Sequence, residues 1–316
     1  MKVYVVGAGA VGRYFGEQLR GIGNDVVYAP RDPDAVVPVA ADLAIVAVKA
    51  YDTAGAIVTL RRALGAESAA TIVTPQNGVG NEEQLAAAFG ADAIVACALT
   101  VPVEIDASGA VRAASGGGVA FAPVGSGRSH NWLLAAFGAT GLPVRVCDDY
   151  RALKWSKLAL NVIANAGCAI LDALPEQLVR SAAFDLEIRA LRETAAAMRA
   201  QGIAAVDLPR YPVRALLRVA ALPLPLARAL LGGRIARARG RKPPSLLLDL
   251  RAGKGRTEVD VLNGAVAAAA RRAGSAAPVN AAYARLVAEI ARNPERWADF
   301  RGRPDALAAE VAAAGT

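Results

Sequence analysis

A glycine-rich turn directly after the first predicted strand limits the folds that are open to this chain. The apolar run KVYVV at residues 2–6 leads into the sequence GAGAVG, and a helical pattern follows. In such a strand–turn–helix unit, the first glycine of GxGxxG permits the tight turn. The second lets the backbone approach a pyrophosphate, and the third lets the helix pack against the strand. The free N–H groups at the helix start also favour phosphate. We therefore predict a dinucleotide-binding turn made of Gly7, Ala8, Gly9, Ala10, Val11 and Gly12.

The first half of the chain alternates short apolar runs with longer helical stretches. Continuous apolar runs without polar alternation are typical of strands that are covered on both faces, as in a parallel sheet. This alternation predicts an α/β fold with an N-terminal Rossmann-type doubly wound sheet. The predicted strands are KVYVV (2–6), DVVYA (25–29), LAIVAV (43–48), TIVTP (71–75) and IVACALTV (94–101).

The pattern changes after about residue 103. Gly109 and the glycines at 116–118 predict hairpins rather than another strand–helix unit. VRVC at 144–147 is the last strand-like run, and from Tyr150 onward the sequence is helical. We therefore expect a dinucleotide-binding Rossmann domain at 1–148, followed by an all-α C-terminal domain at 149–316.

Composition excludes several other classes of protein. With 54% hydrophobic residues the chain can bury a sizeable core, and the absence of a long uncharged apolar run predicts no membrane span. Three scattered cysteines without a CxxC pair and a single histidine, His130, argue against a disulfide framework or a metal site. The N-terminus also lacks the layout of a signal peptide, so we expect a cytoplasmic protein.

The end of the second predicted strand bears on the choice of cofactor. NAD sites usually place an acid there for the ribose hydroxyls, whereas NADP sites place an arginine near the 2′-phosphate. Arg31 lies at this point, and Asp32 comes one residue later than an NAD site requires. We therefore expect NADP(H) as the cofactor, with Arg31 at the 2′-phosphate.

The positive charge of the chain is concentrated in one segment. The formal net charge is +8, yet from Arg210 to Arg256 many arginines are accompanied by a single acid, Asp249. Aromatic residues for stacking on single strands are missing there apart from Tyr211. We therefore expect solvated helix faces and attraction for an anionic small ligand, with no nucleic-acid partner.

Three polar residues in an apolar helical stretch indicate a polar cleft. Lys157, Asn161 and Asn165 are spaced i, i+4 and i+8, which places them on one face of a helix. A cation and two amides on such a face are unfavourable unless they line a polar site. In such a site a lysine can act as a proton donor, because its surroundings can tune it, whereas arginine stays charged.

Four further segments, together with the glycine-rich turn, resemble the ketopantoate reductase (2-dehydropantoate 2-reductase) family in the family's order. The resemblance implies a Rossmann domain and a helical domain with NADPH and substrate in the cleft between them. It also implies hydride transfer to a 2-oxo acid, with the 2-hydroxy acid as the product. The four segments are VAVKAYD (46–52), PQNGVGNEE (75–83), LKWSKLALNVIAN (153–165) and RTEVDVLNG (256–264).

The resemblance assigns roles to individual positions. Lys49 and Asn77 match cofactor-side residues, and Lys157 matches the proton donor. Asn161 and Asn165 match substrate-contacting asparagines, while Ser245 resembles the serine at the polar end of the substrate. Glu258 corresponds to the glutamate of the TE(I/V)D segment and is expected to act with Lys157 in catalysis. Ser245 and Glu258 also suit ordinary positions at helix starts.

The chain departs from the family pattern in three places. The segment between Arg31 and the third strand is short, which affects the expected 2′-phosphate site, and Pro175 stands where another substrate-contacting asparagine is often found. Residues 205–243 are long, and three roles remain open for them: covering the cleft, forming a homodimer interface, or binding a membrane surface. Two alternatives to reduction of 2-dehydropantoate also remain open, namely reduction of a different 2-oxo acid and a non-catalytic NADP-binding regulatory role.

Overall fold

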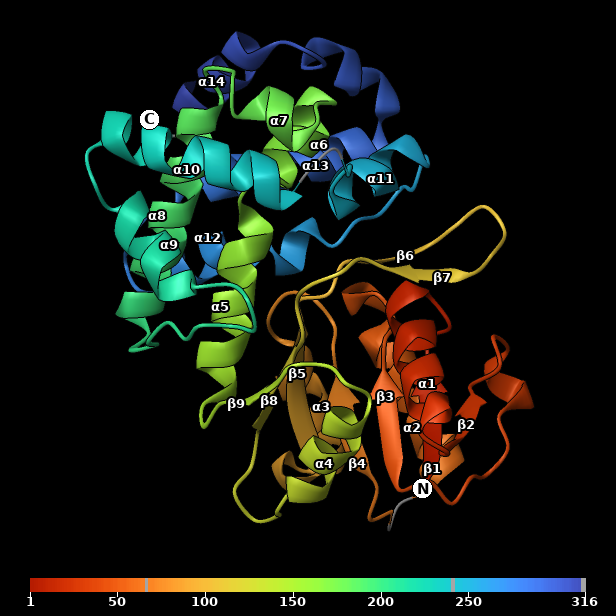
Figure 1. The fold of residues 1–316 in the computed structure, drawn as a ribbon. Helices are drawn as coiled ribbons and strands as arrows, with labels where there is room; N and C mark the ends of the chain where they lie inside the picture. The colour runs from red at the N-terminus through yellow and green to blue at the C-terminus, as the bar shows by residue number, and fades with distance from the viewer. Residues whose placement is uncertain (66–67, 240–241, 314–316) are drawn as a thin grey trace. The chain divides into compact units, whose positions relative to one another are not determined.

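The structure is a computed structural model that describes residues 1–65, 68–239 and 242–313. The chain forms two compact units (Figure 1). One comprises Met1–Lys154 with Val206–Pro212, and the other comprises Trp155–Ala205 with Val213–Thr316. The division falls inside helix α5 (Tyr150–Val162), a few residues beyond the predicted boundary at residue 148. The expectation that cofactor binding lies before residue 148, and substrate binding and catalysis after it, stays a prediction.

The first unit is built on a seven-stranded sheet with the order β2-β1-β3-β4-β5-β8-β9. The strands from β2 to β5 are parallel, and Val3 and Val5 of β1 pair with Val26 and Tyr28 of β2. β8 is antiparallel to β5 and parallel to β9. The strands are β1 (Lys2–Val6), β2 (Asp25–Tyr28), β3 (Leu43–Val46), β4 (Thr71–Thr74), β5 (Ile94–Leu99), β8 (Val119–Pro123) and β9 (Val144–Val146).

Helices cover both faces of this sheet. Alternate residues of the strands pack on one face against Phe15 of α1 (Ala10–Gly21) and Phe137 of α4 (Asn131–Ala139). On the other face they pack against Leu60 of α2 (Thr53–Leu64) and Leu85 of α3 (Asn81–Phe89). Burial on both faces is the reason why the strands are continuous apolar runs. The predicted Rossmann-type doubly wound sheet is confirmed.

The region after residue 103 corrects one prediction. A hairpin of β6 (Val103–Ile105) and β7 (Val111–Ala113) is present, as the glycines indicated. However, β8, α4 and β9 then form another strand–helix–strand unit with parallel strands, which was predicted to be absent. Leu133 and Phe137 of α4 are fully buried against the sheet, so the apolar run NWLLAAFGA serves as a crossover helix.

The second unit is helical, as predicted. α13 packs against α6, α8 and α12, and its Tyr283, Leu286 and Val287 are fully buried. In the first turn of α13, Glu193 of α8 accepts the backbone N–H groups of Val279 and Asn280. The helices that follow α5 are α6 (Ala166–Leu171), α7 (Pro175–Leu178), α8 (Phe184–Ala200), α9 (Val213–Ala220), α10 (Leu224–Arg239), α11 (Ser245–Arg251), α12 (Asn263–Arg272), α13 (Pro278–Arg292) and α14 (Pro304–Ala313).

The described part of the arginine-rich segment contains α9, α10 and α11, and residues 240–241 lie outside the described residues. Pro223 and Pro225 separate α9 from α10, in keeping with proline at a helix start. Arg228 pairs with Asp185 of α8 at 2.7 Å, so part of the charge serves packing within the unit. None of the helices in the described ranges combines the length and apolar character needed to cross a bilayer. A homodimer interface on this segment stays a prediction.

His130, at the start of α4, should make stability depend on pH. Neither ring nitrogen has a hydrogen-bond partner among the described residues. Burial lowers the pKa of His130 below its usual 6.5, Arg128 lowers it further, and Asp92 opposes the shift. The unfolded chain therefore binds more protons than the folded chain between the lowered pKa and about pH 6.5, so the free energy of unfolding should fall as pH drops through this window.

The comparison that tests this is urea unfolding of the wild type and His130→Asn at about pH 7 and about pH 5. The wild type should lose more stability than the variant between the two conditions. The same loss in both proteins would show that His130 is not the responsible group.

Candidate functional site

Three turns that carry predicted cofactor residues lie at one edge of the sheet. The glycine-rich turn follows β1, Lys49 follows β3, and Asn77 follows β4. These strands are neighbours and parallel, so their carboxyl ends share an edge. In open α/β sheets this is the edge at which ligands bind. The structure thus brings the predicted cofactor residues of these three turns together.

Two glycines of the turn are required by packing. Gly7 has φ +105°, and a Cβ there would lie 2.7 Å from the backbone carbon of Ala47. A Cβ on Gly12 would lie 1.9 Å from the carbonyl oxygen of Gly7. These contacts involve backbone atoms, which cannot move aside cheaply. Gly7 and Gly12 therefore allow β1, α1 and the turn after β3 to approach one another, as predicted for the first and third glycines.

Gly9 has a different environment, which suits a bound phosphate. No described atom lies within 4 Å of a Cβ built on Gly9, so the backbone here faces open space. Gly9 is the N-cap of α1, and neither a capping side chain nor a first-turn acid is found there among the described residues. The first N–H groups of α1 and the positive end of the helix dipole thus remain for an anion. The turn fits a dinucleotide pyrophosphate.

Arg13 is a cation at this turn that the sequence interpretation missed. Its Nε donates to the carbonyl oxygen of Ala8 at 3.0 Å, and its Nη1 donates to that of Gly109 at 3.1 Å. The side chain therefore holds the turn and adds positive charge beside it. The available signal was an arginine directly after the GxGxxG sequence.

Arg31 follows β2 as predicted and is exposed. Because its side chain is exposed, its guanidinium can contact a ligand. Asp32, by contrast, accepts the backbone N–H of Asp34 at 2.9 Å. Arg62 also reaches this short loop and pairs with Asp34 at 2.8 Å.

A buried ion pair next to this edge was also missed. Lys154 and Glu82 are 2% and 1% exposed, and Nζ of the lysine lies 2.9 Å from Oε1 of the glutamate. Burial raises the pKa of the Glu82 carboxyl, and the Lys154 ammonium opposes that shift. From sequence, Glu82 suits the acidic first turn of a helix, and it does lie in the first turn of α3. Its burial comes from a partner far along the chain.

Lys157 and Asn161 lie one turn apart on α5, as their spacing predicts. Both side chains are partly buried, whereas their neighbours Leu158 and Val162 are fully buried. This portion of α5 therefore presents a cation and an amide at the margin of an apolar helix face. That arrangement is the one predicted for the proton donor and its neighbouring substrate residue.

The helix predicted to carry Asn165 on the same face is interrupted, which corrects the expected i, i+4, i+8 array. α5 ends at Val162, Ala164 has φ +52°, and α6 begins at Ala166. The fully buried carboxylate of Glu187 accepts the backbone N–H of Ala164 and also the hydroxyl of Tyr283 at 2.8 Å. These contacts from α8 and α13 stabilise a left-handed residue that the local sequence does not suggest.

Asn165 lies beside the start of α11. Its side chain is 3% exposed, and its Oδ1 accepts the backbone N–H of Leu246 at 3.2 Å. Ser245, the residue before Leu246, is exposed and is the first residue of α11, with Pro244 as the N-cap. The break after α5 thus brings two predicted substrate residues, Asn165 and Ser245, next to each other.

Glu258 is 6% exposed and directly precedes the short 3₁₀ helix Val259–Val261. The hydroxyl of Thr257 accepts the N–H of Val259 at 3.4 Å, as a residue at a helix start does. A glutamate that served only the helix dipole would have no need of burial. Burial of Glu258 therefore favours a specific role for its carboxylate.

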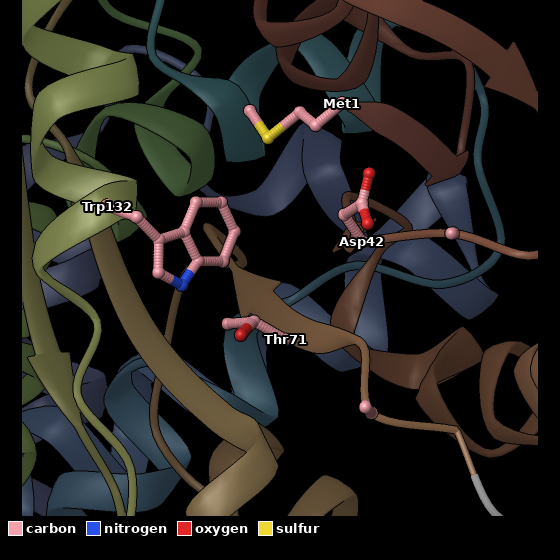
Figure 2. A pocket seen from close by; sticks show the side chains of 6 residues that line it. Met1, Asp42, Thr71 and Trp132 are labelled. Atoms are coloured by element: carbon pink, nitrogen blue, oxygen red, sulfur yellow. The ribbon is translucent and has the colours of Figure 1, made fainter.

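A hollow of about 440 Å³ lies at the opposite edge of the sheet (Figure 2). Met1, Asp42 and Thr71 come from the amino ends of β1, β3 and β4, and Trp132 comes from α4. Asp42 accepts the backbone N–H of Lys2 at 2.7 Å. Because the glycine-rich turn lies at the carboxyl ends of the same strands, this hollow is separate from the predicted cofactor site.

Comparison with protein families gives matches to both halves of the chain. Residues 34–126 match the family described as ketopantoate reductase PanE/ApbA. Residues 149–291 match ketopantoate reductase PanE/ApbA C terminal. The two matches include the predicted residues Lys49, Asn77, Lys157 and Glu258.

Individual relatives agree with these matches. A 2-dehydropantoate 2-reductase from Halobacterium salinarum is 32% identical over 263 residues, which cover 81% of this chain and 77% of the relative. The crystal structure of a PanE/ApbA family ketopantoate reductase from Ralstonia eutropha JMP134 has a TM-score of 0.76 at 29% identity, covering 93% of this chain and 100% of that one. D-mandelate dehydrogenase in complex with NADH shares the fold, with a TM-score of 0.75 at 20% identity and coverage of 92% and 99%. With its two-part match and a relative above 30% identity, this chain belongs to the ketopantoate reductase family and is an oxidoreductase.

Proposed function

We propose that this protein reduces a 2-oxo acid, 2-dehydropantoate or a related branched acid, to the 2-hydroxy acid with NADPH. The observation that carries the proposal is the open backbone at Gly9, at the start of a helix, in a chain of the ketopantoate reductase family. NADP(H), when bound, supplies the hydride that reduces the carbonyl carbon.

Lys157 is the general acid in this proposal. The oxygen of a ketone becomes an alkoxide as the carbon is reduced, and it needs a proton. Lysine, unlike arginine, can act as a proton donor because its surroundings can tune it, and Lys157 is partly buried. Its position on α5, one turn from Asn161, supports this assignment.

The other predicted residues hold the substrate and Lys157. Glu258, through its buried carboxylate, orients Lys157 or a substrate hydroxyl. Asn161 and Ser245 bind polar groups of the substrate. Because Oδ1 of Asn165 already accepts a backbone N–H, its Nδ2 amide is the group that we assign to the substrate.

The test of this function is oxidation of NADPH across a panel of 2-oxo acids that includes 2-dehydropantoate. Turnover on at least one branched 2-oxo acid is the expected result. If no 2-oxo acid of the panel is reduced with either NADPH or NADH, the proposed reaction is wrong.

A second candidate is reduction of a bulkier 2-oxo acid by the same residues. Pro175, where the family often has a substrate-contacting asparagine, is buried as the first residue of α7 and offers no side-chain hydrogen bond. The same fold is found in D-mandelate dehydrogenase, so the fold is compatible with an aromatic 2-oxo acid. Turnover on aromatic acids of the panel without turnover on 2-dehydropantoate would favour this candidate.

Arg31 should make the protein prefer NADPH to NADH. An exposed guanidinium at the end of β2 is placed to bind the 2′-phosphate, and a hydrogen bond between charged groups contributes about 1.5–3 kcal/mol. We therefore expect NADPH to bind at least about tenfold more tightly than NADH, a factor that requires about 1.4 kcal/mol.

Calorimetric titration of both cofactors into the wild type and Arg31→Ala measures this preference. The variant should lose most of it by weaker binding of NADPH alone. Arg61→Ala is a matched control, since Arg61 is an exposed arginine in the last turn of α2. Equal affinity of the wild type for NADPH and NADH would contradict the assignment.

A further inference from the structure

The Lys154–Glu82 ion pair is connected to the backbone of the turn after β4. Besides its contact with Glu82, Nζ of Lys154 donates to the carbonyl oxygen of Gln76. Lysine and glutamate are rarely buried fully unless they are paired. The pair thus places an ammonium group at a main-chain carbonyl directly before Asn77.

The side chain of Gln76 joins this turn to the turn after β3. Its Nε2 donates to the carbonyl oxygen of Val48 at 3.1 Å and to the hydroxyl of Thr53 at 2.9 Å. Its Oε1 accepts the hydroxyl of Thr74 at 2.9 Å. Val48 directly precedes Lys49 in the chain, so the backbone next to each of the two proposed cofactor-side residues belongs to one buried network.

Asn81 holds the other side of the same turn. Its Nδ2 donates to the carbonyl oxygen of Asn77 at 3.1 Å, and its Oδ1 accepts the hydroxyl of Thr53 at 3.1 Å. Thr53 and Asn81 are both fully buried. Successive carbonyls, of Gln76 and of Asn77, are therefore each fixed by a buried side chain.

We propose that Lys154 and Glu82 are positioning residues for dinucleotide binding. Glu82 holds the ammonium group of Lys154, and Lys154 holds the Gln76 carbonyl, which sets the direction of the peptide leading to Asn77. The ammonium donates to the Gln76 carbonyl and lies 2.9 Å from Oε1 of Glu82, so the carboxylate balances its charge in the interior. This inference rests on the proposed function, because Asn77 is taken as a cofactor-side residue.

The alternative is that the pair contributes only to stability. Removing one partner would leave an uncompensated buried charge, so a single variant would not separate the two roles. Replacing both partners avoids that charge. Two double variants replace the ion pair with neutral residues: Lys154→Met/Glu82→Leu and the milder Lys154→Met/Glu82→Gln. A thermal unfolding curve shows which of them is folded, and the measurements use that variant.

The experiment measures the Kd for NADPH by calorimetry and kcat on the best 2-oxo acid of the panel. In the folded double variant, we expect the Kd for NADPH to rise by about tenfold, the change that corresponds to losing one well-placed hydrogen bond to the ligand. A pair that serves stability alone would leave both quantities at the wild-type value. An unchanged Kd and kcat in a folded double variant would therefore overturn the inference.

Tyr150→Phe is the matched control. Tyr150 also joins α5 to α3, through a 3.2 Å hydrogen bond from its hydroxyl to Glu83, but among the described residues it makes no hydrogen bond to Gln76. This variant should bind NADPH like the wild type, and weakening equal to that of the double variant would overturn the inference. A wild type that binds no NADPH would refute the proposed function itself, which distinguishes that failure from a failure of the positioning role.

Discussion

Replacing Lys157 with alanine is expected to lower kcat by about 10²–10⁴-fold on the best 2-oxo acid, the usual contribution of a general acid. In the proposed reaction this variant lacks the group that protonates the carbonyl oxygen, and the glycine-rich turn proposed to bind the cofactor is unchanged. The affinity for NADPH should therefore stay close to that of the wild type. Steady-state kinetics combined with calorimetric titration of NADPH measures both quantities.

Lys157→Arg separates proton donation from electrostatic attraction. Guanidinium keeps the positive charge but does not readily release a proton, so this variant should recover little activity. If arginine restores most of the activity, the role of Lys157 is attraction of the substrate carboxylate or the developing alkoxide. Wild-type kcat in both variants would mean that the proton comes from another group.

Much of the sheet could be predicted because the relevant signals are local. Strand burial on both faces produces uninterrupted apolar runs, and GxGxxG after the first run identifies both the turn and the edge at which it lies. The carboxyl ends of β3 and β4 then follow from the parallel order, which places Lys49 and Asn77 at that edge. In the missed unit of β8, α4 and β9, the first strand directly follows three glycines, a position that equally suits a hairpin.

The break after α5 could not be predicted, because its cause lies elsewhere in the chain. The sequence from Tyr150 to Gly167 has a continuous helical pattern, and alanine at position 164 is the residue least expected to end a helix. The left-handed conformation of Ala164 depends on a hydrogen bond from its N–H to Glu187, a residue of α8. Tertiary contacts therefore decide where Asn165 points, and they place it beside Ser245 rather than in line with Lys157 and Asn161.

The burial of the Lys154–Glu82 pair could not be predicted from the local sequence either, because it also depends on contacts between distant parts of the chain. Each residue has an ordinary local explanation, Glu82 as an acid in the first turn of α3 and Lys154 as a polar residue on an amphipathic helix. Their burial becomes evident only when Lys154 of α5 is seen to contact both Glu82 of α3 and the Gln76 carbonyl oxygen. A lysine between Leu153 and Trp155, in a chain with few lysines, was the available signal.

The substitutions Gly9→Ala and Gly12→Ala are expected to change different properties. The first should weaken NADPH binding, and the second should lower stability. Gly9 faces open space, so Gly9→Ala should fold with a wild-type Tm, while its methyl group would occupy the position proposed for the pyrophosphate. The Kd for NADPH should then rise by about tenfold or more. In Gly12→Ala the new Cβ would lie 1.9 Å from the carbonyl oxygen of Gly7, so the helix and the turn must separate. Such overpacking costs about 1–3 kcal/mol or more and should lower the Tm.

Gly21→Ala provides the control on the same helix. Gly21 is the last residue of α1, has no described atom within 4 Å of a built Cβ, and has no positive φ. Alanine there should leave the Kd for NADPH unchanged and raise stability by about 0.4–1 kcal/mol, since it restricts the unfolded chain. Thermal unfolding and NADPH titration of the three variants give the decisive comparison. Wild-type affinity in Gly9→Ala would show that no phosphate approaches this backbone, whereas a loss of affinity at unchanged Tm locates the pyrophosphate at the start of α1.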